Sequence, residues 1–134
     1  QLNRLRLFSG EQAVFGEGVE VSFNIPVKSF WVTDIIAHFL GSGAEAVSVN
    51  DIRLTSQTAG FKDAGTGILM RRSFLRPPFR IAAIGNKNDL RHAIAQEGGI
   101  IDRIERAYPW IKVIVSEQES IAIPPLSPEY LSAE

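Results

Sequence analysis

The chain has 134 residues, of which 45% are hydrophobic and 22% are charged, and its formal net charge is -1. These values are typical of one globular domain, exclude a disordered segment and give no field that would draw the chain onto nucleic acid. The absence of cysteine excludes disulfides, thiol nucleophiles and thiolate metal sites. No apolar run reaches the ~20 residues that cross a bilayer as a helix.

The first residues give a weak helical pattern. The chain begins with Gln1 rather than methionine, so we expect it to be a piece of a longer protein. Leu2 and Leu5 are spaced as in the last turns of an amphipathic helix or coiled coil, although a short frayed helix fits equally well. We expect the end of a helix or coiled-coil linker over 1–15, one domain over 16–124 and a tail over 125–134.

The first part of the domain predicts a strand followed by a helix. Apolar and polar residues alternate over 19–25, which indicates a half-buried strand. Ser29 is the expected N-cap of a helix over 30–40, in which apolar residues recur every four positions. Gly41 and Gly43 are expected to end this helix, because glycine readily takes the left-handed conformation.

The middle of the chain predicts short strands and turns. A strand over 44–49 is followed by a hairpin turn at Asn50 and Asp51. The remaining expected elements are an extended segment over 52–54, a loop with one short strand over 55–66, a strand over 68–71, a tight turn at Arg72 and Ser73, and a strand over 79–84.

The last part predicts two helices and two strands. Asn86 and Asp89 form a capping pair for a helix that runs through Gln96. The other expected elements are a helix over 100–107, a strand over 110–115, a polar turn over 117–119 and a final strand over 120–123.

This order of elements predicts an α+β fold. We expect a ferredoxin-like split β-α-β-β-α-β sheet with additional hairpin strands and with the helices mainly on one face. A doubly wound parallel sheet is the alternative, but the chain has too few helices to cover both faces of one. The predicted core consists of Val19, Phe23, Ile35, Phe39, Val47, Val49, Ile81, Ile84, Ile104 and Val113.

Several short strings resemble one bacterial family. They are Gly16–Val21, Asp34–Ile35, Gly43–Leu54, Pro77–Asn86, Leu90, Gly98–Gly99 and Ile121–Pro124. In this order they resemble domain-of-unknown-function family 881, whose YlxW/YlxX-like members were once labelled "division initiation protein". The resemblance covers Gly16 to Pro124. Asp51 departs from it, because relatives usually place glycine after Asn50, and this leaves the turn type open.

The resemblance implies an architecture rather than a chemistry. It implies a transmembrane helix at the N-terminus of the whole protein, then a coiled coil, then this domain outside the cytoplasm. It also implies an association with cell division. The family offers no catalytic residues to transfer, and it implies no cofactor.

Two groups of charged residues are candidates for binding. Arg71, Arg72, Arg76 and Arg80 form the one local excess of positive charge. Guanidinium groups suit phosphate or carboxylate partners, although a solvated basic hairpin explains them equally well. Glu45 is the most prominent carboxylate, and we expect it to bond to loop amides or to pair with Arg53 or Arg80 rather than to act as a general base.

Other patterns do not support chemistry. His38 follows Asp34 by one helical turn, but two such residues do not make a recognised metal site, so we expect no metal. Gly60 to Gly67 lacks the lysine, the hydroxyl and the following helix of a phosphate loop. We therefore expect a non-enzymatic interaction or scaffold domain of a membrane-anchored coiled-coil protein. A small-molecule or envelope-polymer binding domain is the alternative.

Overall fold

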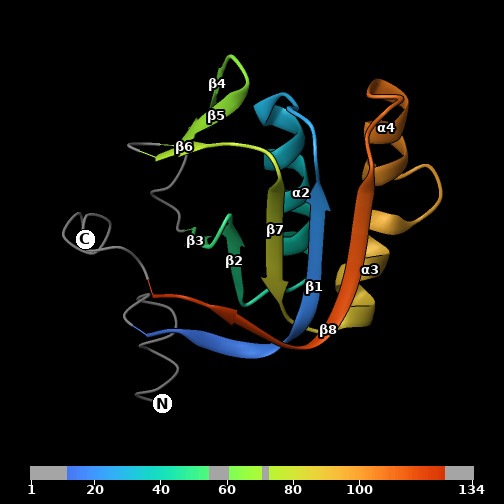
Figure 1. Ribbon diagram of the computed structural model, residues 1–134. Coiled ribbons are helices and arrows are strands. Elements are labelled where there is room, and N and C mark those ends of the chain that lie inside the picture. The colour runs from blue at the N-terminus through green and yellow to red at the C-terminus, as the bar shows by residue number, and fades with distance from the viewer. Residues whose placement is uncertain (1–11, 55–60, 71–72, 126–134) are drawn as a thin grey trace.

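The computed structural model describes residues 12–54, 61–70 and 73–125. Within them it has a mixed α+β architecture with three helices, a five-stranded antiparallel sheet and a three-stranded sheet (Figure 1). The elements are β1 (Val14–Phe23), α2 (Ser29–Gly41), β2 (Ala46–Val49), β3 (Ile52–Arg53), β4 (Phe61–Ala64), β5 (Gly67–Met70), β6 (Ser73–Leu75), β7 (Phe79–Ile84), α3 (Lys87–Ala95), α4 (Ile100–Ala107) and β8 (Val113–Ile123).

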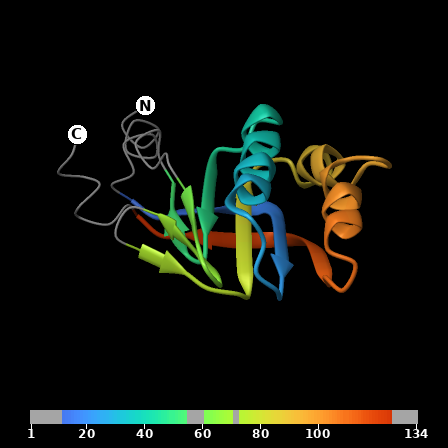
Figure 2. The same ribbon diagram turned by 90° about the horizontal axis from the view of Figure 1, so that it is seen from above.

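The five-stranded sheet has the order β3-β2-β7-β1-β8, so β7 is its central strand, with β2 on one side and β1 on the other. Helix α2 connects β1 to β2, and helices α3 and α4 connect β7 to β8. Figures 1 and 2 show the three helices on one face of this sheet. The crossovers are needed because β1 and β2 are separated in the sheet by β7, so a short hairpin cannot join them.

The main core lies between this sheet and the helices. In β1, alternate residues Val19, Val21 and Phe23 face the core, as period two requires. All ten residues of the predicted core are buried except Val113, which is half-buried and packs against the main core. Ile84 is buried on the opposite face of the sheet. The expected strand over 79–84 and helix over 100–107 are confirmed.

The outer halves of β1 and β8 bend away from the sheet as a pair. The pairing register shifts between Gly16 and Gly18, where β8 carries one extra residue. Figure 1 shows both strands curving together at one end of the molecule. Their outer residues bury a second, smaller cluster against the face without helices: Val14, Ala46, Ala82, Ile84, Ile121 and Ile123.

This bend corrects two expectations. Strand β1 begins at Val14 rather than at residue 19, and residues 117–119 lie inside one continuous strand instead of forming a turn. The bulge interrupts the alternation of apolar and polar residues in β8, which is why the sequence predicts a turn within this strand. Glu117 pairs with Arg91 at 3.4 Å, so helix α3 helps to hold this polar part of β8 in place.

The start of α2 differs from the prediction, whereas its end agrees. Ser29 is the first helical residue, and Lys28 occupies the N-cap position without a side-chain bond. Instead, Oδ1 of Asp63 in β4 accepts the Ser29 N–H at 2.6 Å. At the other end, Gly43 has a φ of 87° just beyond the helix, as expected of a closing glycine.

Two predicted local motifs are confirmed. Asn50 and Asp51 have φ values of 49° and 67° and join Val49 to Ile52, which is a two-residue hairpin turn with positive φ at both positions. Asn86 accepts the Asp89 N–H at 3.0 Å and caps α3. The expected turn at Arg72 lies outside the described residues, as do residues 1–11 of the helix or linker expected over 1–15 and most of the tail. The expected end of that linker is wrong, because Val14 and Phe15 already belong to β1.

The three-stranded sheet, of order β4-β5-β6, lies beside the N-terminal end of α2. One of its faces contributes Ile68, Met70 and Leu75 to the main core. Its other face therefore looks away from the protein. No helix within the described residues is long and apolar enough to cross a membrane.

Candidate functional site

The predicted basic cluster is divided between two environments. Arg71 and Arg72 lie outside the described residues, whereas Arg76 and Arg80 are placed. The Arg76 guanidinium lies 5.4 Å from the centroid of the Phe74 ring on β6. Arg80, on β7, is engaged by two carboxylates of the large sheet. Of the two described arginines, Arg76 is therefore the one associated with the three-stranded sheet.

The outer face of the three-stranded sheet is apolar at its centre. Leu69 and Phe74 are direct cross-strand partners, and they are 37% and 42% exposed. Lys62 is the partner of Leu69 on the other side, so cationic side chains from Lys62 and Arg76 border the apolar pair. We call Lys62, Leu69, Phe74 and Arg76 the outer patch. An unbroken apolar run at 68–70 was the signal in the sequence, because an ordinary surface strand would place a polar residue at 69.

A shallow trough lies on the face of the large sheet that carries no helix. It has a volume of about 390 Å³ and is lined by Glu20, Ser22, Asn50, Asp51, Pro78 and Arg80. Nη2 of Arg80 pairs with the Asp51 carboxylate, and Nε lies 3.6 Å from Oε2 of Glu20. The hydrogen bond with Asp51 raises the pKa of Arg80. The trough thus combines one guanidinium with two carboxylates.

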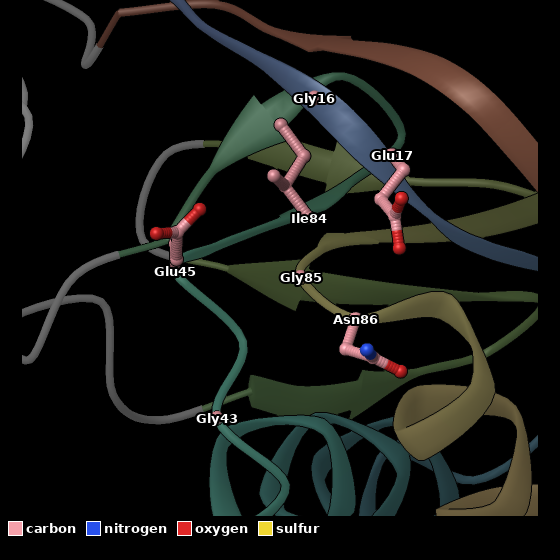
Figure 3. A pocket seen from close by; sticks show the side chains of 7 residues that line it. All are labelled: Gly16, Glu17, Gly43, Glu45, Ile84, Gly85 and Asn86. Atoms are coloured by element: carbon pink, nitrogen blue, oxygen red, sulfur yellow. The ribbon is translucent and has the colours of Figure 1, made fainter.

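Glu45 lies in a different depression, at the end of β7 and the start of α3. This depression of about 260 Å³ is lined by Gly16, Glu17, Gly43, Glu45, Ile84, Gly85 and Asn86. In the view of Figure 3, Glu17 and Glu45 lie on opposite sides of Ile84. Oε2 of Glu17 accepts the Lys87 N–H at 3.1 Å, so this carboxylate is already hydrogen-bonded to a free backbone N–H in the first turn of α3.

Within the described residues, Glu45 pairs with neither of the two arginines expected as its partners, and its side chain is exposed. Arg80 lies beside Asn50, at the opposite end of the β2-β7 pair from Glu45. Nη1 of Arg53 donates to the Gln12 carbonyl at 2.8 Å, and burial lowers the pKa of Arg53.

The two histidines do not assemble a metal site in the described part of the chain. The His38 ring contacts the backbone oxygen of Asp34 at 2.7 Å rather than its carboxylate. No three His, Cys, Asp or Glu side chains among the described residues are grouped so that they could hold a metal ion.

A cluster of aromatic residues at the start of α2 was missed by sequence reasoning. The Phe30 and Trp31 rings stack with centroids 4.7 Å apart, and Trp31 meets Tyr108 edge-on at 6.4 Å. Trp110, two residues beyond Tyr108, is 88% exposed. Trp31 belongs to the apolar repeat that predicts the helix over 30–40, and a strand was expected to start at residue 110. The strand begins only at Val113.

A family model described as "Bacterial protein of unknown function (DUF881)" matches residues 1–132. The chain belongs to this family. The resemblance inferred from the sequence strings is therefore confirmed.

A curated relative of this DUF881 chain is the UPF0749 protein YlxW of Bacillus subtilis (strain 168). The two are 29% identical over 136 residues, which cover 92% of this chain and 58% of YlxW. The chain therefore spans a little over half of the length of that relative.

A solved structure has the same fold. It is the crystal structure of an uncharacterized conserved protein from Mycobacterium tuberculosis, with a TM-score of 0.82 and 24% sequence identity. The match covers 93% of this chain and 90% of the other. At this identity the likeness establishes the fold alone.

Proposed function

We propose that this DUF881 domain is a non-enzymatic interaction module that binds an acidic protein partner through the outer patch. The observation that carries the proposal is the exposed apolar pair of Leu69 and Phe74 on a sheet whose other face is already buried. Apolar groups that have no neighbour in the fold gain most from being covered by a partner.

The charge of the patch selects the kind of partner. Lys62 and Arg76 flank the apolar pair, while Asp63, the acidic residue next to Lys62, is turned to the backbone of α2. Cations around an apolar centre favour a partner with carboxylates around its own apolar centre, because complementary charge speeds encounter and excludes other surfaces. The partner class is therefore an acidic protein surface.

A site-specific photo-crosslinker tests this proposal. Benzoylphenylalanine placed at position 74 of the full-length protein in its natural host is expected to form a protein adduct, and Arg76→Glu is expected to abolish it. The same group at Phe15 is the matched control, because Phe15 is 69% exposed but lies on the bent part of β1. Equal adducts from both positions, or an adduct unaffected by Arg76→Glu, would contradict the choice of surface.

We further propose that the domain lies outside the cytoplasm, joined through a coiled coil to a membrane helix, and serves cell division or envelope assembly. This rests on the family relationship and on the length of YlxW beyond the matched part. Protease added to spheroplasts of the natural host should then remove the domain from the full-length protein. Protection that is lost only on lysis would place the domain in the cytoplasm.

The coiled coil is proposed to pair two copies of the domain. A tethered second contact strengthens binding through its effective concentration, so a modest patch would suffice. The 134-residue chain should be monomeric or weakly dimeric, and the full-length protein should be a stable oligomer. A monomeric full-length protein in detergent, measured by light scattering, would refute the pairing.

We also infer that the large sheet is a ferredoxin-like arrangement, with the three-stranded sheet as an insertion. The order β2-β7-β1-β8 and the antiparallel neighbours support it, as do the helical crossovers from β1 to β2 and from β7 to β8. An experimental structure that placed β8 beside β7 instead of β1 would overturn this assignment.

A further inference from the structure

We propose that the trough around Arg80 is a binding site for a neutral, polyhydroxylated ligand such as one or two units of a saccharide chain. This site is separate from the outer patch and independent of the function proposed for it. Its polar groups come from two strands and one turn: Glu20 and Ser22 from β1, Arg80 from β7, and Asn50 and Asp51 from the turn after β2.

The trough is held rigidly by the Asn50 side chain. Oδ1 of Asn50 accepts the Arg80 N–H at 2.8 Å, and Nδ2 donates to the Arg76 carbonyl at 3.2 Å. The Asn50 N–H also donates to the Arg80 carbonyl at 2.8 Å. These bonds fix the hairpin turn against β7, so Asp51 and Arg80 keep their relative position without a ligand. Such preorganisation lowers the entropy lost on binding.

The charges of the trough disfavour two common classes of ligand. Glu20, Asp51 and Arg80 together carry one net negative charge, so a phosphate or carboxylate ligand would be repelled by two carboxylates. A cationic amine or guanidinium would have to displace Arg80, which already pairs with both carboxylates. A neutral ligand avoids both costs.

The donors and acceptors favour hydroxyl groups. Arg80 directs Nε and Nη2 to Glu20 and Asp51, which leaves other N–H groups of its guanidinium for a ligand. Each carboxylate also retains lone pairs, and the Ser22 hydroxyl can both donate and accept. A pair of neighbouring hydroxyl groups can donate to a carboxylate and accept from Arg80 at the same time. A purely donating or purely accepting ligand cannot.

The size and the walls of the trough suit a sugar ring. Its volume of about 390 Å³ falls in the range of small-molecule sites, roughly 300–1,000 Å³. Pro78 lines one side and can pack against the C–H face of a pyranose ring while the polar groups bind its hydroxyls. Ile114, which is 51% exposed, lies next to this lining as the cross-strand partner of Ser22.

An NMR titration tests the site. Backbone amides of the 134-residue chain would be followed in ¹H–¹⁵N spectra with maltotriose and with triacetylchitotriose, and separately with inorganic phosphate and trilysine. We expect at least one trisaccharide to shift the amides of Ser22, Asp51 and Arg80 saturably. Phosphate and trilysine should leave them unchanged.

Variants connect the shifts to the trough. Asp51→Asn keeps the side-chain size and tolerates positive φ, and it should weaken saccharide binding about tenfold, the loss expected for a hydrogen bond to a charged group. Glu45→Gln removes an exposed carboxylate outside the trough and should leave the saccharide affinity unchanged. If Asp51→Asn alters the whole spectrum, Glu20→Gln takes its place. No saturable shift with either saccharide, tighter binding of phosphate or trilysine, or wild-type affinity in the trough variant would each overturn the proposal.

Discussion

Replacing Gly18 by alanine should destabilise the domain strongly, because Gly18 lies where β1 leaves the plane of the sheet. A Cβ atom at this position would lie 1.9 Å from the Ala83 backbone oxygen and 3.1 Å from Cδ1 of Ile121. Real Cβ atoms essentially never approach closer than 3.0 Å, so β1 and β7 would have to separate by about 1 Å. The obstacle is backbone, which cannot rotate away as a side chain would.

The size of the effect follows from the contacts that this separation breaks. Crowding a packed interior costs about 1–3 kcal/mol, and each buried backbone group left without its partner costs about the same. We expect Gly18→Ala to lower the free energy of unfolding by roughly 3–5 kcal/mol in total. With a urea m-value of about 2 kcal/mol/M, the midpoint should fall by about 2 M.

Urea unfolding followed by far-UV circular dichroism measures this loss, and Gly41→Ala is the matched control. Gly41 ends α2, has no positive φ and has no atom within 4 Å of an added Cβ. Its replacement should change stability by less than about 1 kcal/mol, in the stabilising direction. If Gly18→Ala also stayed within about 1 kcal/mol of the wild type, the close approach of β1 to β7 would be wrong.

Three further changes test other parts of the fold. Asp63→Ala should cost about 1 kcal/mol by removing the acceptor at the start of α2, whereas Asp63→Asn should retain most of the stability in the same urea assay. Ile81→Ala should cost about 2–5 kcal/mol because this side chain is fully buried, and Ile114→Ala, at an exposed position, should cost far less; equal midpoints would contradict the assigned faces. The hydrogen bond to Glu119 raises the pKa of Lys87 above its usual 10.5. The stabilisation that this pair gives the fold is therefore present below about pH 10.5, and it is lost as the pH rises through the pKa that Lys87 has in the folded protein. The stability difference between wild type and Lys87→Gln should accordingly be flat near neutrality and shrink above about pH 10.5; a difference that grew with pH would refute the assignment.

Local patterns in the sequence predicted most elements because each carries its own signal. The strand over 79–84 is marked by prolines before it and glycine after it, and Asn86 caps the next helix within three residues. The turn at Asn50 and Asp51 is equally local, since both residues tolerate positive φ. Such signals do not depend on distant parts of the chain.

The errors have a common cause in long-range contacts. The start of α2 is satisfied by Asp63, 34 residues later, so Ser29 was a reasonable but wrong choice of cap. The bulge in β8 is set by its pairing with β1, and periodicity within 113–123 cannot reveal it. Alternation is a reliable guide only where the partner strand is regular.

The candidate sites were harder to predict than the fold. Sequence reasoning grouped Arg76 with Arg80 because they are four residues apart, but β7 directs Arg80 to Asp51 and Glu20 on another face. The trough forms only when β1, β7 and β2 pair in register. Leu69 and Phe74 are exposed because the three-stranded sheet packs its other face against the main core. Neither relation is written in a short stretch of sequence.

The place of β1 in the sheet also constrains the order in which the domain can form. Among the described strands β1 is made first, yet its two neighbours are β7 and β8, and Val14 pairs with Ile123 about a hundred residues later. During synthesis the apolar face of β1 therefore stays uncovered until nearly all of the domain has emerged. Contacts of such long sequence separation make folding slow, and an incomplete chain exposes an unpaired apolar strand. A cell that makes this protein has to keep β1 from pairing with other chains until β8 arrives.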